Sequence, residues 1–168
     1  FVKLRNGIWR NMGGCLAPMN AYLNIIGMET LGLRMERVCN NAFRLAQALE
    51  KLEGVSVNYP LLESSPYHEL AEKQLSGKGG AILTIRTGSK ERAYKLINHL
   101  KYVKIATNIG DVRTLVIHPA STIYIHSTPE AMEEAGVYDD TIRISVGIED
   151  IKDLIQDFTE AVESLGEE

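Results

Sequence analysis

Arg143 is the residue of this chain whose side chain and position on a predicted strand most favour the binding of a ligand. It lies in residues 141–146, TIRISV, where Ile142 and Ile144 alternate as the buried face of a strand should, so Arg143 points to the opposite face. A guanidinium on a rigid strand can hold a carboxylate through two parallel hydrogen bonds. The alternative is a structural arginine that pairs with an Asp or Glu of its own chain, and the strand by itself favours that alternative.

The other chemically capable residues form no complete catalytic constellation. The histidines show none of the HxH, HExxH or CxxC-type spacings of a metal site, so no metal is expected. There is no GxSxG elbow, P-loop or GxGxxG motif. The carboxylate pairs at 139–140 and 149–150 flank the ends of elements, where such residues more often cap than catalyse. The four histidines are His68, His99, His118 and His126.

Composition excludes several classes of partner. The chain has 168 residues, of which 45% are hydrophobic and 24% charged, so one domain with an appendage is the natural expectation. A net charge of −4 provides no basic excess for a nucleic acid or an anionic membrane. No apolar run reaches the ~20 residues of a membrane helix. Cys15 and Cys39 lie far apart and are expected to be reduced thiols in a cytoplasmic protein.

The elements that must position Arg143 form an α/β pattern. Residues 1–17 read as irregular, and a short apolar helix over 19–28 precedes a long helix over 33–52 whose apolar positions share one face. From residue 55 onward strands alternate with helices, which predicts a two-layer α/β sandwich with helices on one face of a mainly antiparallel sheet. The predicted strands are 55–59, 81–85, 103–107, 115–118 and the segment around Arg143; the predicted helices are 68–75, 89–100, a short one opened by Thr128-Pro129, and 150–165.

Eight segments, in order, resemble the C-terminal part of the Cys/Met-metabolism enzymes, which use pyridoxal phosphate and have fold type I. The resemblance covers nearly the whole chain, and its most characteristic segments are the last three. The segments are 14–21 (GCLAPMNA), 27–31 (GMETL), 34–37 (RMER), 58–60 (NYP), 65–71 (SPYHELA), 108–111 (NIGD), 115–121 (LVIHPAS) and 143–150 (RISVGIED). The resemblance implies that residues 1–32 are the tail of a cofactor domain and its linker, and 33–168 a long connecting helix and C-terminal α/β domain.

The resemblance also implies roles for two residues. In this family the arginine of the RxSVG[IL]E motif grips the α-carboxylate of the amino-acid substrate, and here it is Arg143. The residue that opens the N/S-x-G-D turn helps to position that carboxylate, and here it is Asn108, as in the O-acetylhomoserine sulfhydrylases. The family makes or breaks C–S bonds with pyridoxal 5'-phosphate as electron sink. It usually assembles as homodimers or homotetramers.

Two departures from the family pattern qualify the prediction. No SxTK motif with a Schiff-base lysine occurs, so the chain resembles a fragment that needs an upstream cofactor domain and is expected to be inactive alone. Thr122 is followed by Ile123-Tyr124, where many members have Thr-His, so the substrate stays open. The open alternatives are a cystathionine γ-synthase or methionine γ-lyase type of enzyme, and a non-catalytic domain that binds an amino acid or mediates assembly.

Overall fold

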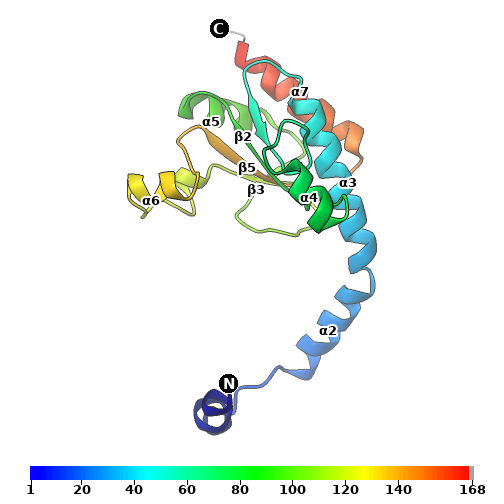
Figure 1. Ribbon diagram of the computed structural model, residues 1–168, viewed down its shortest axis with the longest axis vertical. Helices are drawn as coiled ribbons and strands as arrows, with labels where there is room; N and C mark the ends of the chain where they lie inside the picture. Colours follow the sequence, from blue (N-terminus) through cyan, green and yellow to red (C-terminus); the bar gives the residue numbers. More distant parts are fainter. Residues whose placement is uncertain (167–168) are drawn as a thin grey trace. The chain divides into compact units, whose positions relative to one another are not determined.

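The computed structural model describes residues 1–166 and divides the chain into two compact units, Phe1–Leu33 and Arg34–Glu168 (Figure 1). The long helix α3 (Leu31–Leu49) begins in the first unit and continues in the second. The second unit contains the sheet and the remaining helices, and therefore Arg143 and Asn108.

The first unit is more helical than its glycines suggest. A π-helical segment, η1 (Leu4–Trp9), continues into α1 (Arg10–Met12), so the prediction that residues 1–17 are irregular is wrong for this part. Gly7 is accommodated within the helix, and the chain turns only at Gly13, whose φ of 68° favours glycine. Helix α2 (Pro18–Glu29) follows, with proline at its start as predicted.

Every residue of α2 lies outside the hydrophobic core. Its apolar side chains are distributed around the helix and are largely exposed; Met19, for example, is 65% exposed and Met28 62%. A helix that is apolar on all sides is normally covered by other protein. This helix therefore carries an extensive surface suited to contact with further protein.

The second unit follows the predicted α/β order closely. Each predicted strand and helix is present, with ends that differ by a few residues. Helices α5 (Lys90–His99), α6 (Pro129–Glu134) and α7 (Ile151–Glu163) begin as predicted, with caps from Ser89, Thr128 and Asp150. The remaining elements are β1 (Ser56–Asn58), α4 (His68–Leu75), β2 (Ile82–Arg86), β3 (Lys104–Ile105), β4 (Leu115–Ile117), η2 (Pro119–Ser121), β5 (Thr141–Ser145) and η3 (Ser164–Gly166).

The five strands form one sheet in the order β1-β2-β5-β4-β3. All neighbouring pairs are antiparallel except β3 and β4, which confirms the prediction of a mainly antiparallel sheet. The strand that carries Arg143 lies at the centre. Its two neighbours fix its register: Thr84 of β2 and Ile117 of β4 lie directly opposite Arg143.

Helices cover one face of this sheet (Figure 1). Ile142 and Ile144 of β5 are fully buried in the same hydrophobic cluster as side chains of α3, α5 and α7. The strand alternation predicted from the sequence is thus confirmed, because the one residue between these two isoleucines points to the other face. That other face carries Arg143.

Candidate functional site

The guanidinium of Arg143 is held by backbone carbonyl groups. Its Nη2 donates to the carbonyl oxygen of Thr107 at 2.7 Å and lies 3.5 Å from that of Asn108. Its Nε is buried and has no hydrogen-bond partner within residues 1–166. Burial without a compensating anion lowers the pKa of Arg143, although an arginine at this position stays charged.

No carboxylate of the described residues pairs with this guanidinium, although several acidic residues flank β5. Asp140 accepts from Arg86 Nε at 2.8 Å, forming an ion pair within the chain. Glu149 accepts from Thr114, and Asp150 caps α7. Asp140, Glu149 and Asp150 are therefore engaged elsewhere. The ion-paired structural arginine that the strand alone favoured is not observed in the described part of the chain.

Asn108 lies in the irregular segment between β3 and β4, residues 106–114, which we call the site loop. The Asn108 side chain is exposed and makes no hydrogen bond in the part of the chain that the structure describes, so its amide is available to a ligand. Its carbonyl oxygen faces the guanidinium of Arg143. The structure thus brings Asn108 and Arg143 together, although they lie 35 positions apart in the sequence.

The residues after Arg143 hold the site loop against β5. Gly147 lies so close to the loop backbone that an added Cβ would be 2.6 Å from the carbonyl carbon of Arg113. The Gly147 amide donates to the Thr114 hydroxyl at 2.9 Å, and the Ser145 hydroxyl lies 3.4 Å from the amide of Gly110. Sequence reasoning did not assign these contacts, because side chains of loops give no periodic signal.

His118 is a structural residue in this arrangement. It is buried, its Nε2 donates to the carbonyl oxygen of Asp139 at 2.6 Å, and its Nδ1 accepts from the amide of Ser121 at 3.2 Å. These contacts close the turn after β4 and join it to the segment before β5. Ile123 stands at a position where the chain departs from the Thr-His pattern of many family members, and its side chain is 49% exposed.

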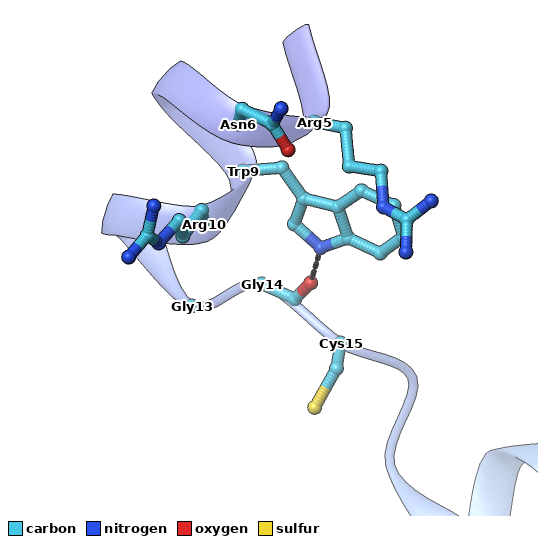
Figure 2. Close-up of a pocket in the computed structure, with 7 residues that line it drawn as sticks. All are labelled: Arg5, Asn6, Trp9, Arg10, Gly13, Gly14 and Cys15. Carbon is cyan, nitrogen blue, oxygen red and sulfur yellow. Dashed lines mark hydrogen bonds between the residues drawn. The ribbon is translucent and has the colours of Figure 1, made fainter. Parts of the chain in front are cut away.

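A separate hollow of about 350 Å³ lies in the first unit (Figure 2). The Trp9 indole donates to the Gly14 carbonyl, and the side chain of Arg5 extends beside the indole ring. Arg10 and the exposed thiol of Cys15 also line the hollow. Its lining residues carry positive charge and include neither Arg143 nor Asn108.

Every lysine is exposed. No group of three or more His, Cys, Asp or Glu side chains within residues 1–166 could hold a metal ion. Among these residues, no helix combines the length and apolar character needed to cross a membrane.

Comparison with known proteins decides the family. The model of the Cys/Met metabolism PLP-dependent enzymes matches residues 2–163. The chain belongs to this family. It is 42% identical over 163 residues to O-acetyl-L-homoserine sulfhydrylase 1 of Thermus thermophilus, with 96% of this chain covered. It is 46% identical over 156 residues to the homocysteine synthase of Schizosaccharomyces pombe, with 92% covered. Pyridoxal phosphate is the cofactor of the family.

Other members of the family are similar to nearly the same degree. An L-methionine γ-lyase of Fusobacterium nucleatum subsp. polymorphum is 40% identical over 154 residues, with 91% of this chain and 39% of that protein covered. A crystal structure of a putative O-acetylhomoserine (thiol)-lyase from Campylobacter jejuni, which contains a pyridoxyl-lysine adduct, matches with a TM-score of 0.90 and 35% identity. The match covers 96% of this chain and 39% of the Campylobacter chain.

The chain spans about two-fifths of the length of these relatives: 39% of the Thermus protein and 36% of the Schizosaccharomyces protein. The fold type I architecture expected from the sequence is confirmed by the Campylobacter structure. The roles of Arg143 and Asn108, in contrast, stay predictions from sequence that the geometry supports.

Proposed function

We propose that Arg143 binds the α-carboxylate of an amino-acid substrate in a pyridoxal phosphate enzyme that forms or cleaves C–S bonds. The observation that carries the proposal is the guanidinium without an acidic partner: Nη2 donates to the Thr107 carbonyl, and the buried Nε makes no hydrogen bond within residues 1–166. A partly buried cation without an anionic partner is stabilised when a carboxylate binds to it through charge-assisted hydrogen bonds. The cofactor, when bound, supplies the electron sink for the chemistry.

Asn108 serves the same carboxylate in this proposal. Its carbonyl oxygen contacts the arginine, and its exposed side-chain amide can donate to a ligand oxygen. The asparagine at this position, together with the relatives named O-acetyl-L-homoserine sulfhydrylase and homocysteine synthase, favours a sulfhydrylase that acts on an O-acyl-homoserine. A methionine γ-lyase type is the second candidate, favoured by 40% identity to the Fusobacterium enzyme.

The site test compares Arg143→Ala and Arg143→Lys in the full-length protein that contains this chain. Loss of a charge-assisted bidentate contact should cost about 2–5 kcal/mol of binding, so KM for the amino acid rises by roughly 30-fold or more. The lysine variant should recover part of this loss, because it restores charge without the planar pair of donors. The absorption spectrum of the bound cofactor should not change.

Arg86→Ala is the matched control, because Arg86 lies on the same sheet face but is paired with Asp140. It should leave KM within about twofold of the parent. Equal KM values for the parent and Arg143→Ala would refute the carboxylate role.

A substrate comparison separates the two candidate reactions. The sulfhydrylase proposal expects homocysteine from O-acetyl-L-homoserine and sulfide at a kcat/KM well above that for the consumption of L-methionine. The reverse order would favour the γ-lyase type. A cytoplasmic location and a homodimer or homotetramer stay predictions; the exposed apolar surface of α2 supports assembly with further protein.

A further inference from the structure

The site loop that covers Arg143 is held by hydrogen bonds and not by a buried core of its own. Residues 107–113 are all exposed, and the segment contains no regular secondary structure. Thr114, at the end of the loop, is the first fully buried residue. The Thr107 end of the loop continues from β3, and the Ala106 amide there donates to the carbonyl oxygen of Val116 at 3.2 Å. The course of the loop beside Arg143 then depends on what fixes its other end, at Thr114.

Glu149 fixes it with both oxygens of its carboxylate. Its Oε1 accepts from the Thr114 amide at 2.6 Å, and its Oε2 accepts from the Thr114 hydroxyl at 2.9 Å. The Ile148 amide adds a bond to the carbonyl oxygen of Val112 at 2.9 Å. Hydrogen bonds to a carboxylate are about twice as strong as neutral ones, so Glu149 provides the strongest side-chain attachment of the loop.

Glu149 is itself held from the other side. Asn41, a fully buried residue of α3, donates from Nδ2 to the carbonyl oxygens of Gly147 and Glu149, at 3.0 and 2.9 Å. Arg37 Nη2 donates to the Glu149 carbonyl at 3.2 Å. A continuous set of hydrogen bonds thus runs from α3 through Glu149 to the loop that contacts Arg143.

We propose that Glu149 is a positioning residue for the carboxylate site: it keeps the site loop closed on β5, so that Arg143 is presented with its Nη2 fixed by Thr107. The inference rests on the proposed role of Arg143. Glu149 does not touch the substrate in this account. Its loss lets the loop move away, frees the guanidinium to rotate, and weakens binding of the amino acid although Arg143 is intact.

The test compares Glu149→Ala and Glu149→Gln with Asp157→Ala in the full-length protein. Asp157 is a matched control because it is a buried carboxylate that fixes a different turn, accepting from the amides of Lys101 and Tyr102 at 3.0–3.2 Å. Amide hydrogen exchange over residues 106–114 and KM for O-acetyl-L-homoserine are measured for each variant.

Glu149→Ala should accelerate exchange in the site loop and raise KM about 10- to 100-fold, with a smaller change in kcat. Glu149→Gln, which can still accept from the Thr114 amide, should recover most of both effects. Asp157→Ala should lower the Tm but leave KM and the exchange of the site loop within about twofold of the parent.

The inference is overturned if Glu149→Ala leaves loop exchange unchanged, or leaves KM unchanged while Arg143→Ala raises it. It is also overturned if Asp157→Ala raises KM as much as Glu149→Ala, because the effect would then be general destabilisation. An unchanged KM in Arg143→Ala would instead refute the proposed function, and the hydrogen-exchange result would still report on the loop by itself.

Discussion

Arg86 and Arg143 lie on the same face of adjacent strands, yet the chain treats them differently. Arg86 donates to Asp140 at 2.8 Å, and its guanidinium lies 4.0 Å above the ring of Tyr138. Arg143 contacts only carbonyl oxygens and has a buried Nε without a partner in the described residues. One arginine is neutralised by its own chain and the other is not. The difference supports our proposal that Arg143 is the cation that binds a ligand carboxylate.

Giving Arg143 a partner of its own should remove this difference. Thr84 lies directly opposite Arg143 in the antiparallel pair, so Thr84→Glu places a carboxylate within reach of the guanidinium. This internal carboxylate should compete with substrate and reduce its affinity by about 2–4 kcal/mol, measured as KM for the amino acid. Thr84→Gln is the matched control and should change KM by less than about threefold, and a similar loss in both variants would show that bulk and not charge is responsible.

Removing the partner of Arg86 should have a different consequence. Asp140 is buried and also accepts from the amide of Gly88 at 3.0 Å, so Asp140→Ala leaves two donors unsatisfied. We expect a loss of about 1–3 kcal/mol in the free energy of unfolding, measured by urea denaturation. Amino-acid affinity should stay near that of the parent. A large rise in KM without loss of stability would mean that Arg86 and Asp140 belong to the binding site.

The smallest expected effect concerns the ring beside Arg86. Tyr138→Leu keeps an apolar contact but removes the π face under the guanidinium. The cost should be about 0.5–1 kcal/mol of stability, since Arg86 is partly exposed. Urea denaturation measures it, and a Tyr138→Phe variant, which retains the π face, should be nearly neutral. Equal losses for leucine and phenylalanine would assign the effect to the tyrosine hydroxyl.

Much of the fold could be predicted from the sequence because it depends on local signals. Alternation of Ile142 and Ile144 identified the buried face of β5, and Ser89 and Thr128 marked the starts of two helices. The helix over residues 4–12 was missed because Gly7 was interpreted as a breaker, although Leu4 and Ile8 have helical spacing.

The state of Arg143 could not be predicted from sequence. Acidic residues lie on both sides of β5, and each is near enough along the chain to be a possible partner. Only the tertiary structure shows that Asp140 turns to Arg86 and Glu149 to Thr114. The family resemblance points to Arg143, and the pairing of its acidic neighbours with other residues supports our proposal that it binds a ligand.

The most direct test is a crystal structure of the full-length protein with bound L-norleucine, an amino acid without a leaving group on its γ carbon. The account predicts that the ligand carboxylate lies about 2.7–2.9 Å from guanidinium nitrogens of Arg143, while Arg86 stays paired with Asp140. A ligand carboxylate bound elsewhere, or an Arg143 already neutralised by an Asp or Glu from another part of the protein, would contradict it.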